Sequence, residues 1–218
     1  MKIAVIGSGN IGGTLGKIWM DRKHEVMFGV RDIKSPRVKA LMESSSKPVH
    51  VSSVQEACAH GEVILLAIPW NAVTGLFEGL QLDVKNKILI DCTNPIAPGL
   101  NGLSLGYTTS AAEEIAKMAK GARVVKAFNT IGSGNLTDLS FGSIPADTFI
   151  CGDDSEAKQI VRKLAEEVGF NVIDSGPLFQ ARLLEPLAML WISLAYKYGY
   201  GSDIAIKLLK REKSERYV

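Results

Sequence analysis

Cysteine and histidine are scarce in this sequence. Its 218 residues include three of each, with no Cys-x-x-Cys pair, and the histidines do not stand at the spacing of metal ligands. A zinc or iron–sulfur site is therefore not expected, and we assign no metal to the chain. Unpaired thiols are typical of a reducing compartment, so we predict a cytoplasmic location.

A strong excess of one charge is absent too, and so is a long hydrophobic run. Lys and Arg number 25 against 23 Asp and Glu, which argues against binding to nucleic acid. The longest apolar run, residues 187–195, is half the length of a membrane span, and residues 1–6 are too short for the apolar core of a signal peptide. We therefore expect neither a nucleic-acid partner nor a membrane.

Short apolar segments alternate with amphipathic ones along most of the chain. Continuous apolar runs, typical of strands buried on both faces of a parallel sheet, include residues 3–6, 63–68 and 88–90. Between such runs, apolar residues recur at helical spacing, most clearly from 157 to 168. This alternation predicts an α/β fold of Rossmann type, with a doubly wound, mostly parallel sheet.

The pattern changes near residue 180. Residues 183–196 are apolar on nearly every face, which predicts a helix buried all round, either under the sheet or against a partner chain. We accordingly divide the chain into a nucleotide-binding Rossmann domain, 1–178, and a helical C-terminal part, 179–218. The second part would complete an acceptor pocket or a dimer interface.

A glycine loop follows the first predicted strand and opens an amphipathic helix. The residues that fit the pattern G-x-G-x-x-G are Gly7, Ser8, Gly9, Asn10, Ile11 and Gly12. In such a loop the first glycine makes a tight turn, the second lets a pyrophosphate approach the backbone, and the third lets the helix pack against the strand. The free N–H groups at the start of the helix then face the phosphates, which predicts a dinucleotide site.

The end of the second predicted strand selects the dinucleotide. NAD enzymes usually place a carboxylate there for the ribose 2′-OH, whereas an Arg accommodates a 2′-phosphate. This sequence has Arg31 at that point and Lys34 nearby, so we predict NADP(H) as the cofactor. Asp32, one residue further on, is the alternative, as a partner of the 2′-OH.

Three further strand ends carry polar or aromatic residues, and ligands sit beyond the carboxyl ends of strands in such sheets. The candidates for substrate binding are Trp70, Thr93, Asn94, Asn129 and Thr130. These strand ends hold neither a histidine nor paired carboxylates. We therefore expect them to orient an uncharged planar ring rather than to carry out general acid–base chemistry. We name no catalytic residue.

Four other residues have simpler interpretations. Cys92 is expected to be a small buried apolar side chain. Asp153 is expected to cap a helix rather than bind Mg²⁺. Arg182 and Glu185, three residues apart, would pair with each other or anchor the end of the chain.

Taken together, the motifs resemble the NADP oxidoreductases of the coenzyme F-420-dependent type. They are found at residues 7–12, 68–70, 151–154, 174–178 and 181–185. Residues 125–130 are similar to the cytoplasmic reductase domain of the six-transmembrane metalloreductases. The resemblance implies a Rossmann domain with a short helical C-terminal part, a homodimer, and direct hydride transfer between the nicotinamide and a flavin-like ring.

The resemblance also implies roles for individual residues. The loop from Ser8 to Gly12 and Arg31 would contact NADP, and Ile68, Pro69 and Ala127 would flank the nicotinamide. The loops of Trp70, Asn94 and Asn129 would face the second ring. Asn129 occupies a position where some deazaflavin-reducing relatives have a histidine.

The electron acceptor therefore stays open between coenzyme F-420, FMN and FAD. Three alternative functions are a flavin or ferric reductase, a dehydrogenase of small hydroxy or imino acids, and an NADPH-binding regulatory sensor without turnover.

Overall fold

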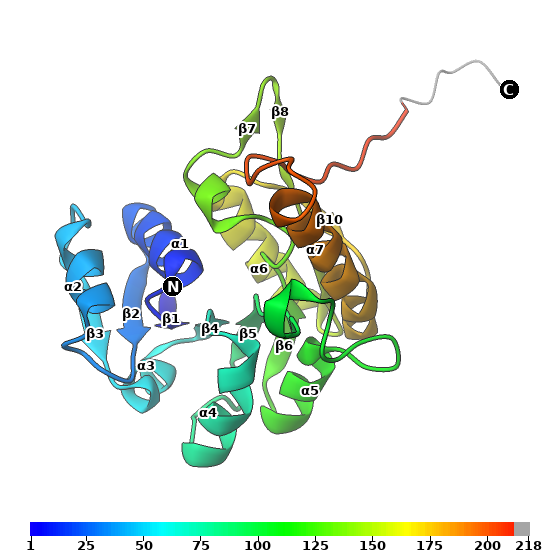
Figure 1. Ribbon diagram of the computed structural model, residues 1–218. Coiled ribbons are helices and arrows are strands. Elements are labelled where there is room, and N and C mark those ends of the chain that lie inside the picture. Colours follow the sequence, from blue (N-terminus) through cyan, green and yellow to red (C-terminus); the bar gives the residue numbers. More distant parts are fainter. Residues whose placement is uncertain (212–218) are drawn as a thin grey trace, which may run out of the picture.

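An eight-stranded sheet runs through the centre of the protein, whose computed structural model describes residues 1–211 (Figure 1). Its strands are β1 (Lys2–Ile6), β2 (Glu25–Gly29), β3 (His50–Ser52), β4 (Val63–Leu66), β5 (Ile88–Asp91), β6 (Arg123–Lys126), β9 (Asp147–Gly152) and β10 (Asn171–Asp174). They lie in the order β10-β9-β6-β5-β4-β1-β2-β3. The two remaining strands, β7 (Ser140–Phe141) and β8 (Ile144–Pro145), form a separate hairpin.

Six of the strands follow the order of a Rossmann sheet. From β3 to β6 all neighbouring strands are parallel, and β1 lies between β2 and β4. Only β9 pairs antiparallel, with β6, and β10 runs parallel to β9. The predicted doubly wound, mostly parallel sheet is confirmed, and its switch point lies between β1 and β4, where such folds bind ligands.

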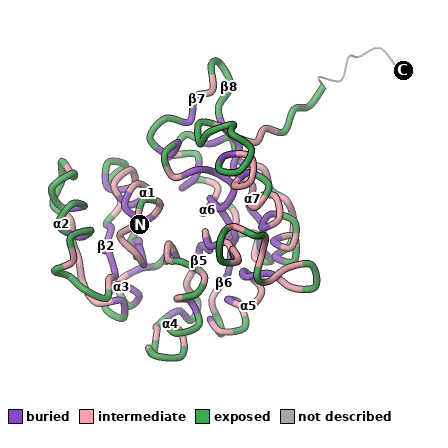
Figure 2. Tube along the Cα trace, viewed as in Figure 1, coloured by how far each residue is buried: buried purple, intermediate pink, exposed green. Residues whose placement is uncertain are grey.

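Helices cover both faces of the sheet. They are α1 (Asn10–Asp21), α2 (Pro36–Glu43), α3 (Val54–His60), α4 (Val73–Gly79), α5 (Ala111–Met118), α6 (Ser155–Val168) and α7 (Ala181–Tyr196). Short 3₁₀ turns are η1 (Trp70–Ala72), η2 (Pro98–Leu100), η3 (Ser133–Thr137) and η4 (Leu178–Gln180). The apolar sides of α1 and α6 bury one face, and those of α3, α4, α5 and the start of α7 bury the other. Figure 2 shows the buried residues concentrated along the strands between these layers.

Side chains that bind free backbone N–H groups mark where several helices begin. Ser53 and Glu56 form a capping box at the start of α3, and Ser110 caps α5. Helix α6 is capped by Asp154, whose Oδ1 accepts from the N–H of Ala157 at 2.7 Å. The prediction that Asp153 is the cap was wrong by one residue, because Asp153 Oδ1 accepts from the backbone N–H of Leu178 at 2.8 Å instead.

The prediction that the helix over residues 183–196 is buried all round was wrong for α7. Ala181, Leu184 and Ala188 pack inward, but Leu183 and Leu190 on the outer face are 65% and 54% exposed. By length and composition, the stretch Leu178–Tyr196 is apolar enough to cross a membrane, yet 44% of it is buried inside this fold. The apolar outer face thus has no cover within the described residues.

After α7 the chain continues without regular structure over residues 197–211. The side-chain amide of Asn135 donates to the carbonyls of Ser202 and Ile204 at 2.9 and 3.1 Å. Lys207 Nζ lies 2.6 Å from Asp147 Oδ1 at the start of β9. This strap, residues 197–211, is therefore tied to the segment that follows β6. The division into domains at residue 178 stays a prediction, and residues 212–218 of its second part lie outside the described residues.

Candidate active site

The glycine loop between β1 and α1 has the geometry that a dinucleotide needs. Gly7 has a φ of 108°, and a Cβ there would collide with the carbonyl of Ala67. A Cβ on Gly12 would collide with the carbonyl of Gly7. Around Gly9, by contrast, a Cβ would meet no described atom within 4 Å. Gly7 and Gly12 are therefore required because a side chain would collide with the backbone, whereas the missing side chain of Gly9 leaves open space in front of the helix.

The start of α1 is left free for a ligand. Its N-cap is Gly9, no side chain caps it, and no acidic residue stands in its first turn. The first N–H groups of a helix carry partial positive charge and bind anions when no side chain occupies them. This end of α1 therefore has the geometry that a pyrophosphate needs, and the contacts of Ser8, Asn10 and Ile11 with it stay predictions.

The loop after β2 places cations where a 2′-phosphate is expected. Arg31 and Lys34 are exposed, and neither side chain has a hydrogen-bond partner or an ion-pair partner among the described residues. Asp32 Oδ1 accepts from the backbone N–H of Lys34 at 2.9 Å. The carboxylate thus shapes the turn, which favours the phosphate interpretation over a contact of Asp32 with the ribose.

The ends of β4 and β6 present different surfaces. Ile68 and Trp70 are half-buried and Pro69 is exposed, so the segment after β4 borders the surface. Ala127, after β6, is completely buried in the core, and its N–H donates to the carbonyl of Asp91 at 3.0 Å. Their place beside the nicotinamide stays a prediction.

Two asparagines join the ends of β5 and β6. Asn94 Nδ2 donates to the backbone carbonyl of Asn129 at 2.9 Å. Asn129 Nδ2 donates to Asn94 Oδ1 and to the carbonyl of Leu184 on α7, both at 3.0 Å. Backbone carbonyls can only accept, so these contacts fix the orientation of both amides. The residue before Asn129, Phe128, has a φ of 60°, a backbone conformation that is uncommon outside glycine and often occurs at functional sites.

Three buried polar atoms at these strand ends have no hydrogen-bond partner among the described residues: Thr93 Oγ1, Thr130 Oγ1 and Asn129 Oδ1. Burying an unpaired polar atom costs about 1–3 kcal/mol. Their concentration after β5 and β6 distinguishes this region from the rest of the described interior. Substrate binding by these residues stays a prediction.

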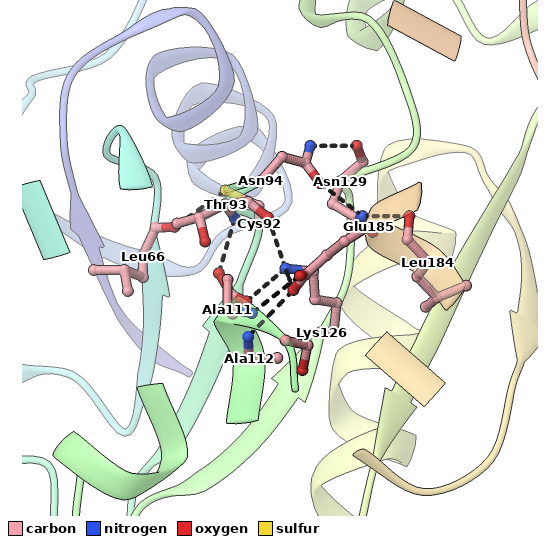
Figure 3. Close-up of polar contacts among 12 residues, drawn as sticks. Leu66, Cys92, Thr93, Asn94, Ala111, Ala112, Lys126, Asn129, Leu184 and Glu185 are labelled. Atoms are coloured by element: carbon pink, nitrogen blue, oxygen red, sulfur yellow. Dashed lines mark hydrogen bonds and ion pairs between the residues drawn. The ribbon is translucent and has the colours of Figure 1, made fainter. Parts of the chain in front are cut away.

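A buried ion cluster below the asparagines was missed by the sequence analysis (Figure 3). Lys126 Nζ lies 2.8 Å from Asp91 Oδ2 and 2.7 Å from Glu185 Oε1, and it donates to the carbonyl of Thr93 at 2.6 Å. The side chains of Asp91, Lys126 and Glu185 are at most 1% exposed. An ammonium has three N–H donors, and each has an acceptor here, so Lys126 has none left for a ligand.

The charged groups of the cluster shift one another's pKa values. Burial on its own lowers the pKa of Lys126, but the attraction of Asp91 and Glu185 is larger, and this pKa lies above its ordinary value. Burial raises the pKa of Glu185 although Lys126 and the N–H of Ala111 oppose the shift. Lys126 therefore stays protonated, and its role is to hold neighbouring segments rather than to transfer a proton.

Glu185 also binds the start of helix α5. Its Oε2 accepts from the N–H of Ala111 at 3.0 Å and its Oε1 from that of Ala112 at 3.2 Å. Of the two alternatives for Arg182 and Glu185, pairing with each other is wrong, because Arg182 makes two hydrogen bonds to Glu113, at 2.9 and 2.7 Å. The sequence did carry a signal, since Asp91, Lys126 and Glu185 each stand among apolar residues, where a charge needs a partner.

The cysteines supply no nucleophile. Cys92 Sγ donates to the carbonyl of Leu66 at 3.2 Å, and burial, assisted by Asp91, raises the pKa of this thiol to about 12. Within residues 1–211, no group of three or more His, Cys, Asp or Glu side chains could hold a metal ion. The buried ions of the cluster and the amide nitrogens of the two asparagines are thus engaged within the protein, whereas Thr93 Oγ1, Thr130 Oγ1 and Asn129 Oδ1 are left without a partner among the described residues.

Comparisons with known proteins agree with this geometry. A sequence model of the family described as NADP oxidoreductase, coenzyme F420-dependent, matches residues 2–95. The F420-dependent NADP reductase of Methanothermobacter marburgensis is 33% identical over 210 residues, which cover 90% of this chain and 93% of that protein. A solved structure assigned as an F420-dependent NADP reductase, from Arthrobacter sp. FB24, has a TM-score of 0.83 at 28% identity and covers 96% of this chain and 100% of its own.

A second group of relatives is larger than this chain. Metalloreductase STEAP3 of Rattus norvegicus is 29% identical over 234 residues, which cover 99% of this chain but 45% of that protein. The similarity is therefore to one part of the metalloreductase and extends along nearly all of this chain.

Proposed function

Because the chain belongs to the family of F420-dependent NADP oxidoreductases, we propose that it transfers a hydride between NADP(H) and the deazaflavin ring of coenzyme F420. The observation that carries the proposal is the 33% identity to a reductase of that name over 90% of this chain. The chain is an NADP-dependent oxidoreductase, and its glycine loop, free helix end and exposed Arg31 agree with that class.

The first half of the site binds the dinucleotide in this proposal. The N–H groups at the start of α1 hold the pyrophosphate, and the bare backbone of Gly9 lets it approach. Arg31 and Lys34 hold the 2′-phosphate, which selects NADP(H) over NAD(H). Ile68, Pro69 and Ala127 flank the nicotinamide, which supplies or accepts the hydride when the cofactor is bound.

The second half orients the acceptor ring. Trp70 offers an indole beside the end of β4, and Thr93, Asn94, Asn129 and Thr130 offer polar atoms at the ends of β5 and β6. Hydride transfer between two rings depends on proximity and orientation more than on acid–base groups. The free polar atoms of Thr93, Thr130 and Asn129 support this role, since a bound ring can supply the hydrogen bonds that they lack.

A flavin or ferric reductase is the second candidate. It is favoured by the 29% identity to STEAP3 over 99% of this chain. The two candidates share the hydride donor and differ in the acceptor alone.

Turnover with alternative acceptors tests the proposal. Purified protein is mixed with NADPH and, in separate reactions, with coenzyme F420, FMN, FAD or a ferric chelate, and loss of NADPH absorbance is followed. Fast oxidation with F420 is the expected result, and substituting NADH should slow it. Turnover with an ordinary flavin or ferric chelate only would replace the first candidate by the second. Tight NADPH binding without turnover on any acceptor would favour the regulatory sensor.

Two further parts of the proposal concern assembly and location. We expect a homodimer joined through the outer face of α7, because Leu183 and Leu190 expose 65% and 54% of their surface there and Phe179, in the turn η4 before the helix, exposes 52%. Light scattering should return twice the chain mass of 23.5 kDa, and a monomer would contradict this expectation. A cytoplasmic location rests on the unpaired cysteines.

A further inference from the structure

Asn129, in the segment that follows β6, has a side-chain oxygen without a partner. The residue is 5% exposed, and its Oδ1 accepts no hydrogen bond among residues 1–211. The hydroxyls of Thr93 and Thr130, residues that are 4% and 2% exposed, lack a partner too. Because β5 and β6 are parallel neighbours, with Asp91 opposite Lys126, these segments leave the sheet at the same edge. Buried polar atoms are nearly always paired, so three unpaired ones at one edge indicate a ligand that supplies the missing bonds.

The orientation of the Asn129 amide decides which of its atoms is left over (Figure 3). Nδ2 carries two hydrogens and donates to Asn94 Oδ1 and to the carbonyl of Leu184, both at 3.0 Å. Turning the amide over would set its oxygen against that carbonyl, and two acceptors repel. The Asn94 amide is fixed as well, because its Nδ2 donates to the backbone carbonyl of Asn129 at 2.9 Å. The free atom of Asn129 is therefore an oxygen, which can only accept.

The backbone that leads to Asn129 is held in an uncommon conformation. Phe128 has a φ of 60°, which is costly for a bulky residue and occurs most often at functional sites. Its buried ring packs against those of Trp19 and Phe170, with ring centroids 6.1 and 5.9 Å apart. This packing fixes the turn, so the carboxamide that follows is held in one place.

A ligand that completes this edge has to bring a hydrogen-bond donor. Asn129 Oδ1 needs an N–H or O–H group, and the hydroxyls of Thr93 and Thr130 can each donate to a carbonyl. The pyrimidine end of a flavin or deazaflavin ring offers this combination, because its imide N–H at N3 stands between two carbonyls. A ferric chelate with carboxylate ligands offers no N–H.

We propose that Asn129 is a specificity-determining residue for the electron acceptor, because its Oδ1 accepts a hydrogen bond from the imide N–H of the ring. Thr93 and Thr130 donate to the carbonyls on either side of that N–H. The inference rests on the proposed function, and it assigns the pyrimidine end of the ring to the ends of β5 and β6. The three atoms are buried, so the side chains that cover them have to move when the ring binds.

Methylation of the ring nitrogen tests the proposal without changing the protein. The probes are coenzyme F420 and FMN, each with and without a methyl group on N3. The methyl group removes the N–H of the pyrimidine end and leaves the atom that receives the hydride unchanged. The acceptor KM of the wild type should rise about tenfold or more on methylation. Equal KM values would overturn the inference while leaving the proposed function in place.

Asn129→Leu separates a lost hydrogen bond from added bulk. With Oδ1 removed, methylation of the ring should change the acceptor KM by less than about twofold. A rise as large as that in the wild type would mean that the methyl group acts through its size, and it would overturn the inference. The Kd for NADPH, from fluorescence titration without acceptor, should stay within about twofold of the wild type. A Kd that rises as much as the acceptor KM would place the contact on the nicotinamide carboxamide instead.

Thr130→Val keeps the inference testable if Asn129→Leu does not fold. Valine has a similar shape, and since the hydroxyl has no partner, stability in urea should stay equal or increase. The acceptor KM should nevertheless rise about threefold or more. Thr148→Val is the matched control: Thr148 is fully buried, but its Oγ1 accepts from the N–H of Phe128 at 3.4 Å, so this variant should lose stability.

Two further outcomes are decisive. An unchanged acceptor KM in folded Thr130→Val would overturn the inference and leave the proposed function in place. Wild-type protein that turns over neither F420 nor FMN would overturn both together.

Discussion

Asn94 and Asn129 hold the ends of two neighbouring strands together through a reciprocal pair of hydrogen bonds. Asn94 donates to the backbone carbonyl of Asn129 at 2.9 Å, and Asn129 donates back to the side-chain oxygen of Asn94 at 3.0 Å. The same amide of Asn129 reaches the carbonyl of Leu184 on α7. Three segments that are remote in sequence therefore meet on one buried carboxamide.

Replacing Asn129 by leucine should destabilise the protein and impair turnover. Loss of its hydrogen bonds should lower the free energy of unfolding by about 1–3 kcal/mol, measured by urea titration. The acceptor KM should rise, because the ends of β5 and β6 lose their connection. Asn135→Leu is the control: Asn135 also donates to two backbone carbonyls, those of Ser202 and Ile204, but away from the strand ends. It should lose stability at unchanged KM, and a similar KM change in both variants would contradict the role of Asn129.

Replacing Gly9 by alanine should weaken NADPH binding with little effect on folding. A Cβ at this position meets no described atom within 4 Å, so the loss of stability should be below about 1 kcal/mol. The same Cβ occupies the space needed by the pyrophosphate, and the Kd for NADPH should rise about tenfold or more. Gly75→Ala on α4 also adds a Cβ to open space and should leave the Kd unchanged. Equal Kd values for the two variants would refute the assignment of the glycine loop.

Replacing Arg31 by alanine should reduce the preference for NADPH. A charged hydrogen bond to a phosphate contributes about 1.5–3 kcal/mol, which corresponds to a Kd change of roughly 10- to 100-fold. NADH lacks the 2′-phosphate, so its affinity should change little. Lys163→Ala, which removes an exposed cation on α6, serves as the control. If Arg31→Ala weakens both cofactors equally, the side chain contacts the adenine or ribose instead of the phosphate.

The three cysteines should resist thiol reagents while the protein is folded. Burial raises the pKa of Cys92 and of Cys151 to about 12, and that of Cys58 to about 11. Thiolates are the reactive species, so at about pH 8 almost none is present. Reaction with a disulfide reagent should be slow in buffer and should release three equivalents in denaturant. One equivalent released rapidly from folded protein would show that one of the thiols is more accessible than the structure indicates.

Acid should weaken the attachment of the C-terminal strap. Burial on its own raises the pKa of Asp147, but hydrogen bonds from Lys207, Asn171 and the N–H of Leu208 outweigh it, and the pKa lies below its ordinary 3.8. The stabilisation is therefore complete above that value and is lost as the pH falls through the lowered pKa. Urea titrations between about pH 7 and pH 3 should show a steeper loss of stability in the wild type than in Asp147→Asn. Parallel curves would contradict this linkage.

The sequence by itself determined the local structure of the nucleotide-binding half of the site. The glycine loop, the strand before it and the helix after it are set by local backbone requirements and by apolar periodicity, which are visible in a single segment. The capping box of Ser53 and Glu56 is local in the same way, since its two residues are three positions apart. The resemblance in these motifs likewise identified the family, because the motifs are short and continuous.

Only the tertiary structure decided which distant residues meet. Lys126 bonds to Asp91 and Glu185, which are 35 and 59 residues away in the sequence, and no local pattern specifies such a pairing. The antiparallel course of β9 and the exposed outer face of α7 depend in the same way on how whole elements pack. The sequence shows that each buried charge needs a partner, but only the packing of β5, β6 and α7 determines which partner it finds.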